Sequence, residues 1–112
     1  MKKVLILGLL VGMGASPVAF SNDSIDEKQH EENCKTMSAF AFMAMGARQN
    51  GTPLSSSIDI ANGIPDKNER DIAKKIVLDA YDQTKYSSQE YKDNSRVEFS
   101  NKYMLACMKM YE

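Results

Sequence analysis

The hydrophobic positions of the chain are most concentrated in residues 39–45, where every side chain is apolar. A short apolar run cannot be assigned by its period alone, but this one is rich in Ala and Met and contains no Val or Ile. We therefore predict a helix from about residue 26 to 49, ended by Asn50-Gly51, because Gly readily adopts the left-handed conformation. Since its centre is apolar on all sides, we expect neighbouring helices to cover it, with a close approach at Gly46.

Two shorter patterns follow. Thr52 suits the N-cap of a short second helix, with Pro53 at the first helical position and Asn62-Gly63 at its end. A third helix is predicted to start around residues 66–68, with Leu78 exposed on its charged face. Its apolar stripe at helical spacing comprises Ile72, Ala73, Ile76, Val77, Ala80 and Tyr81.

A loop is predicted over residues 82–88. Ser87 and Glu90 form a capping box that opens a fourth helix, which continues to about Tyr111. Two adjacent stripes along it comprise Val97, Asn101, Met104, Met108 and Tyr111, and Phe99, Tyr103 and Cys107. Four helices, two of them long, around one apolar centre predict a compact all-α bundle.

The first 21 residues are typical of a cleaved signal peptide. Lys2 and Lys3 precede an apolar run over residues 4–11, and Ala19-Phe20-Ser21 fits the small-x-small cleavage pattern. The run is too short to span a membrane, which takes about 20 residues. We therefore expect a periplasmic or secreted protein without a stable membrane anchor. After cleavage, a polar and partly helical segment over residues 22–33 precedes a single helical domain over residues 34–112.

The two cysteines, Cys34 and Cys107, are predicted to form a disulfide, because an even cysteine count in an exported protein indicates pairing. A loop of that length is stabilised by roughly 4 kcal/mol in the chain-entropy model. The bridge joins the first long helix to the end of the last, so the two should run antiparallel. The net charge of −1 becomes more negative when Lys2 and Lys3 leave with the signal, and no basic stripe suits nucleic acid.

No catalytic set is evident, and we expect neither an enzyme nor a cofactor. Nucleophilic catalysis needs a nucleophile beside a base, and the chain has one histidine, His30. His30 and Cys34 are four residues apart, but Cys34 is better used in the disulfide, so no metal site is predicted. Thioethers bind Cu(I), and Met37, Met104 and Met108 are the alternative copper ligands, although Met also fills helical cores well.

Tyr81, Tyr86 and Tyr91 bracket the loop before the fourth helix, and tyrosine is favoured at protein interfaces. The chain also resembles small exported, two-cysteine helical proteins of proteobacteria and their phages, most of them uncharacterised. The resemblance is carried by Cys34, Arg48-Gln49-Asn50-Gly51, Ile76-Val77, Ala80-Tyr81, Phe99 and Cys107. It implies a fold and a compartment rather than an activity.

We expect a binding protein that acts on another envelope or extracellular protein, as an inhibitor or immunity factor does. Small exported immunity proteins are similar in outline. One alternative is an acid-stress periplasmic chaperone of HdeA type, to which the size and single disulfide are similar. In that case protonation of the acidic faces would loosen the fold. The other alternative is the methionine-based Cu(I) carrier.

Overall fold

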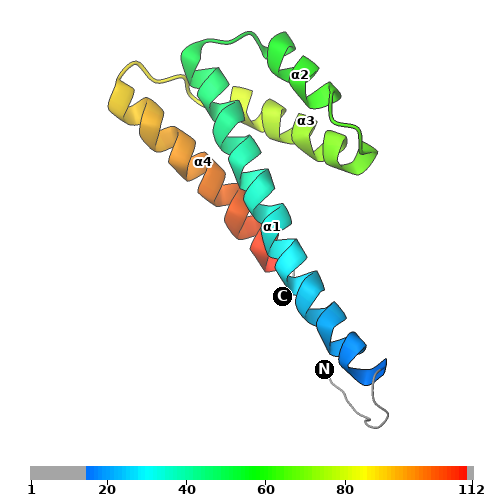
Figure 1. Cartoon of the computed structure of the whole chain (residues 1–112). Coiled ribbons are helices and arrows are strands. Elements are labelled where there is room, and N and C mark those ends of the chain that lie inside the picture. Colours follow the sequence, from blue (N-terminus) through cyan, green and yellow to red (C-terminus); the bar gives the residue numbers. More distant parts are fainter. Residues whose placement is uncertain (1–14, 111–112) are drawn as a thin grey trace. The chain divides into compact units, whose positions relative to one another are not determined.

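The structure is a computed structural model that describes residues 15–110, with side chains described from residue 27 onward. These residues form helices and connecting loops without a strand, which confirms the predicted all-α class (Figure 1). The helices are α1 (Ala15–Asn50), α2 (Leu54–Asn62), α3 (Lys67–Tyr81) and α4 (Gln89–Met110). Residues 1–14, and with them most of the predicted signal peptide, lie outside the described residues. Within the described part of the chain, no helix is both long enough and apolar enough to cross a membrane.

The chain divides into two compact units, Met1–Asn33 and Cys34–Glu112. The described part of the first unit is the beginning of α1, which includes the predicted polar segment. There the Gln29 side-chain amide donates a hydrogen bond of 3.0 Å to Asn33 Oδ1, one turn further along the helix. The packing described below is that of the second unit.

A single cluster of buried side chains forms the core of the second unit. It draws on α1, α2, α3 and α4, and the four members that come from α3 all belong to the apolar stripe predicted for that helix. Its members are Ala41, Ala44, Met45, Ala61, Ala73, Ile76, Val77, Ala80 and Phe99. Ile72, which was assigned to that stripe, is 42% exposed and lies at its edge, whereas Leu78 is exposed as expected.

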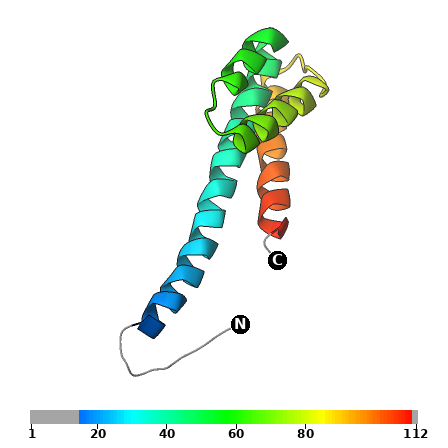
Figure 2. The same ribbon diagram turned by 90° about the vertical axis from the view of Figure 1, so that its right-hand side faces the viewer.

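The second unit brings α1 and α4 side by side in antiparallel directions (Figures 1 and 2). Cys34 and Cys107 form the predicted disulfide, with 5.5 Å between their Cα atoms. Further along α1, Ser38 Oγ donates to the carbonyl oxygen of Ser100 at 3.1 Å. Later residues of α1 therefore lie beside earlier residues of α4, which is the antiparallel arrangement expected from the disulfide.

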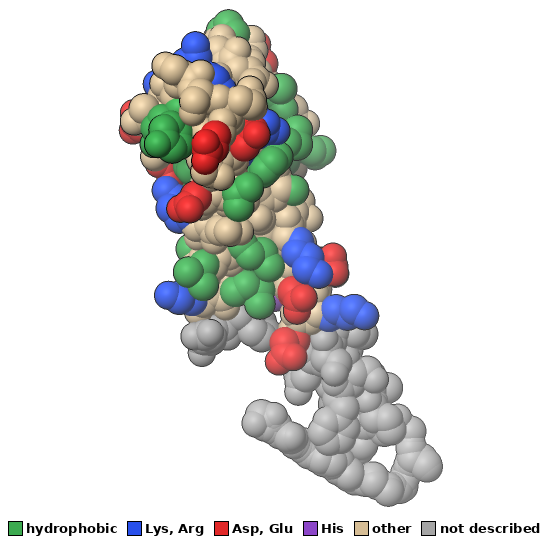
Figure 3. Space-filling view, turned by 90° about the vertical axis from the view of Figure 1, so that its left-hand side faces the viewer, with side chains coloured by type: hydrophobic (Ala, Val, Ile, Leu, Met, Phe, Trp, Pro, Cys, Tyr) green, Lys and Arg blue, Asp and Glu red, His purple; other side chains and the backbone are tan. Residues whose placement is uncertain are grey.

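Two expectations about burial need correction. On α4, the stripe of Phe99 and Cys107 enters the core, whereas Val97 on the other stripe is 49% exposed, because the two stripes point to different sides of the helix. On α1, the apolar centre is covered on one face only, and Met43 is 62% exposed. Hydrophobic side chains accordingly reach the surface in patches (Figure 3).

The helix ends follow local capping chemistry, with two shifts of one residue. Asp66 caps α3 by accepting a hydrogen bond of 2.9 Å from the Glu69 amide, as residues 66–68 suggested. Ser88, rather than Ser87, accepts from the Tyr91 amide at the start of α4. Pro53, rather than Thr52, occupies the N-cap position of α2, and no side chain caps that helix end.

The predicted close approach at Gly46 is made by a side chain of α4. A Cβ atom at this position would lie 3.2 Å from Arg96 Nε, so only glycine leaves the guanidinium its present place. The Arg96 guanidinium carbon lies 4.5 Å from the centre of the Phe42 ring, a cation–π contact. Its buried Nε has no hydrogen-bond partner among the described residues.

Candidate functional site

The loop between α3 and α4 is held in place by the last turn of α1. Arg48 Nε donates a hydrogen bond of 3.0 Å to the carbonyl oxygen of Gln83. The Gln49 side chain donates through Nε2 to the Thr84 carbonyl oxygen at 2.7 Å, and its Oε1 accepts from the Tyr86 amide at 2.8 Å. Three backbone groups of the loop are therefore fixed by two adjacent side chains.

Gln49 is the centre of this arrangement. Its side chain is 1% exposed, and burying an amide is costly unless its polar atoms are hydrogen-bonded. The same residue also accepts, through its own carbonyl oxygen, a hydrogen bond of 2.7 Å from Lys92 Nζ of α4. Gln49 therefore connects the end of α1, the loop and the first turns of α4.

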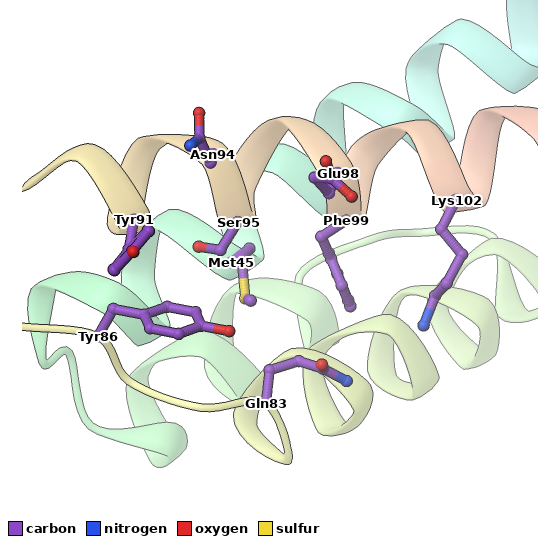
Figure 4. A pocket seen from close by; sticks show the side chains of 9 residues that line it. All are labelled: Met45, Gln83, Tyr86, Tyr91, Asn94, Ser95, Glu98, Phe99 and Lys102. Carbon is purple, nitrogen blue, oxygen red and sulfur yellow. The ribbon is translucent and has the colours of Figure 1, made fainter.

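The anchored loop forms one wall of an open cavity of about 520 Å³, and α4 forms the opposite wall (Figure 4). This volume lies within the range of about 300–1,000 Å³ that is typical of ligand pockets. Its lining combines aromatic, polar and charged side chains: Met45, Gln83, Tyr86, Tyr91, Asn94, Ser95, Glu98, Phe99 and Lys102.

The aromatic part of the cavity consists of two exposed tyrosines above a buried floor. The rings of Tyr86 and Tyr91 lie 5.8 Å apart at an angle of 55°, and the two residues are 38% and 60% exposed. Met45 and Phe99 are buried beneath them and belong to the core. In Figure 4 the Tyr86 hydroxyl points into the cavity, between Met45 and Gln83. The site thus joins a rigid base to accessible aromatic edges.

At the other end of the cavity, a carboxylate of α3 binds side chains of α4. Asp79 Oδ2 accepts hydrogen bonds from Lys102 Nζ at 2.7 Å and from the Tyr103 hydroxyl at 2.6 Å. Its Oδ1 accepts from Gln83 Nε2 at 3.0 Å. The charge of Lys102 is therefore compensated within the protein by Asp79.

These contacts shift the pKa values of both acidic groups away from their ordinary values. Burial raises the pKa of the Asp79 carboxyl group, but the hydrogen bonds from Lys102 and Tyr103 and the Lys102 charge outweigh it, so its pKa is below the ordinary value. Burial, together with the hydrogen bond to Asp79 and its negative charge, raises the pKa of the Tyr103 hydroxyl above the ordinary value. At neutral pH, Asp79 is the acceptor and Tyr103 the donor.

Two of the three tyrosines predicted to bind a partner, Tyr86 and Tyr91, line this cavity. The third, Tyr81, lies in a different place and is used internally. Its hydroxyl donates to the Thr52 carbonyl oxygen at 2.7 Å and lies 3.0 Å from Ser57 Oγ, so it joins α3 to the start of α2.

The methionines proposed as copper ligands occupy different surroundings. Met37 packs against the core cluster, whereas Met104 and Met108 are half-buried on α4 and are not part of that cluster. The cavity instead contains Met45, whose Sδ lies 3.9 Å from Gln49 Nε2. Copper binding by Met37, Met104 and Met108 stays a prediction.

Sequence reasoning missed the residues that shape the site. Arg48 and Gln49 contributed only to the resemblance described above, and Asp79 was not singled out from the sequence. The available signal was the position of Gln49 one helical turn after Met45, on the same face as the end of the apolar run, because a Gln is buried only when its polar atoms have partners.

The arrangement offers aromatic surface and hydrogen-bonding groups. Both cysteines of the chain are oxidised to the disulfide, and the cavity lining contains neither His nor Cys. A concave site with apolar walls and a few polar groups is typical of binding. Comparisons with protein-family models, curated proteins and solved structures find no match to this chain.

Proposed function

We propose that the protein is a small periplasmic or secreted binding protein that occupies the surface of another protein, as an inhibitor or immunity factor does, without catalysis. The observation that carries this proposal is the pair Tyr86 and Tyr91, both exposed at one cavity. Tyr86 lies on the loop that Gln49 holds in place, and Tyr91 lies in the first turn of α4. Tyrosine supplies a large contact area at low entropic cost, and a preorganised loop avoids the cost of ordering on binding.

Photo-crosslinking tests the proposal. We expect a protein carrying benzoylphenylalanine in place of Tyr91 to crosslink one partner from native envelope extract. The same group in place of Ile60, which is 62% exposed on α2, should not crosslink it. Replacing Tyr86 and Tyr91 together by Ala should abolish capture of that partner. Equal crosslinking from both positions, or none from Tyr91, would contradict the proposal.

A second candidate function, an acid-stress chaperone, is favoured by the Asp79 contacts. Asp79 is the acceptor for two donors of α4, and protonating its carboxylate would weaken the link between α3 and α4. Lys102 and Tyr103 also contact the ring of the core residue Phe99, whose exposure would create an apolar binding surface. A protein that binds no apolar dye between about pH 2 and 3, where Asp residues become protonated, would rule out this function.

A further inference from the structure

The cavity has an excess of negative charge. Its charged lining residues are Glu98 and Lys102, and the Lys102 ammonium already lies 2.7 Å from the Asp79 carboxylate. Glu98 forms no ion pair with any described residue. A carboxylate at the rim of an apolar cavity attracts a positive charge and repels a negative one.

The spacing along α4 separates the aromatic wall from this carboxylate. Tyr91 and Glu98 are seven residues apart and line the same cavity, so their Cα atoms are about 10 Å apart along the helix. In Figure 4, Glu98 lies between the tyrosine end and Lys102. An occupant that uses both features needs an apolar portion of several ångströms that ends in a cation.

Lysine and arginine side chains have that form, with an aliphatic stem and a charged end. The stem would pack along Tyr86 and Tyr91 above Met45, and the charged end would reach Glu98. Aromatic rings add cation–π attraction, which is strongest where the cation is partly desolvated. A neutral apolar side chain would leave Glu98 unused, and an acidic one would be repelled by Glu98.

We propose that this cavity binds a lysine or arginine side chain of the partner protein, with its stem on the two tyrosines and its charge on Glu98. This inference rests on the proposed function and adds the chemistry of the contact. It predicts a partner that presents a basic residue on a protruding segment, because the cavity is open on one side and its volume of about 520 Å³ exceeds a single side chain.

Nuclear magnetic resonance titration of the disulfide-bonded protein with three capped pentapeptides tests this inference. The peptides carry Lys, its neutral isostere norleucine, or Glu between glycines. We expect the Lys peptide to shift the Met45 methyl and the Tyr86 and Tyr91 ring signals, and to bind about three- to tenfold more tightly than norleucine. The difference should shrink at high salt.

Glu98→Gln should remove the preference for Lys over norleucine. The control is Glu90→Gln, which makes the same charge change at an exposed α4 position outside the cavity and should retain the preference. Equal binding of Lys and norleucine, a preference for Glu, or no shift with any peptide would overturn the inference. So would concentration-dependent broadening of the same signals without peptide, since a second copy of the chain would then fill the cavity.

The partner itself separates the two proposals. If Glu98→Gln leaves partner crosslinking at Tyr91 intact and its affinity unchanged, the cation inference fails and the proposed function stands. If the protein that carries benzoylphenylalanine at position 91 and retains Glu98 crosslinks no partner, the proposed function fails as well.

Discussion

At the scale of single residues, Gln49 determines the position of the loop between α3 and α4. Its amide satisfies a donor and an acceptor of the loop backbone, and both would be left without partners by an apolar replacement. Buried polar groups that lose their partners cost more than the hydrogen bonds themselves contribute, because they have also lost water.

Replacing Gln49 by Leu should therefore lower the free energy of unfolding by about 2–3 kcal/mol. Urea unfolding measures this, and hydrogen exchange should show that the Tyr86 amide loses protection. Gln29→Leu, an exposed position on the same helix, should change the free energy of unfolding by less than about 0.5 kcal/mol. An unchanged exchange rate at Tyr86 would show that the loop does not depend on Gln49.

Asp79 gives the protein a specific pH dependence. Because its pKa is lowered by folding, its stabilising contribution is complete above the ordinary pKa of Asp, 3.8, and is lost as the pH falls through the lower folded value. Asp79→Asn should lower the melting temperature at pH 7 and leave it nearly unchanged near pH 2.

Thermal unfolding of both proteins between pH 2 and 7 measures the difference. Asp59→Asn, an exposed position on α2, provides the same charge change without the α4 contacts and should have little effect at either pH. A constant difference between Asp79→Asn and the native protein across the range would show that the Asp79 charge is not what stabilises the fold.

At the scale of helices, Gly46 and Arg96 share one place on the contact between α1 and α4. Ala in a helix interior is more stable than Gly by about 1 kcal/mol, but here its Cβ would crowd the guanidinium. Gly46→Ala should therefore stabilise an Arg96→Ala protein by about 1 kcal/mol and the native protein by clearly less. Urea unfolding of the four proteins in this cycle measures the coupling, and equal effects in both backgrounds would refute it.

Helices and their order could be predicted because they depend on local patterns. The Asp66 cap and the stripe of Ile76 and Val77 are determined by neighbouring residues, which a sequence displays directly. On α4, two apolar stripes satisfied the same period, and which one turned inward depended on packing against α1. Val97 therefore lies at the surface.

The cavity could be predicted only in part. Tyr86 and Tyr91 were recognised by residue type and by their nearness in sequence. Gln49 lies 37 residues before Tyr86 in the sequence and accepts a hydrogen bond from its backbone amide. No local sequence pattern indicates where that part of the loop backbone lies. Asp79 and Lys102 likewise meet only because α3 and α4 pack together.

At the scale of the molecule, the disulfide closes most of the second unit into one loop. Its cysteines are separated by 73 residues, and removing such a closure should cost about 4 kcal/mol in the chain-entropy model. Small domains have only about 5–15 kcal/mol in total. Replacing Cys34 and Cys107 by Ala should thus greatly lower the urea midpoint.

A reducing agent should lower the midpoint of the native protein by a similar amount and leave that of the double variant unchanged. If the native protein unfolds at the same urea concentration with and without reductant, the closure does not contribute to stability in this way.

Because α1 holds the loop through its backbone groups, the loop side chains can differ without moving the loop. Arg48 and Gln49 bind carbonyl oxygens and an amide, groups that every amino acid except proline provides in full. The identities of the loop side chains at positions 84–86 can therefore be exchanged while the path of the backbone is retained. The same framework can display different recognition sequences, so that related chains could diverge in what they bind without having to evolve a new fold.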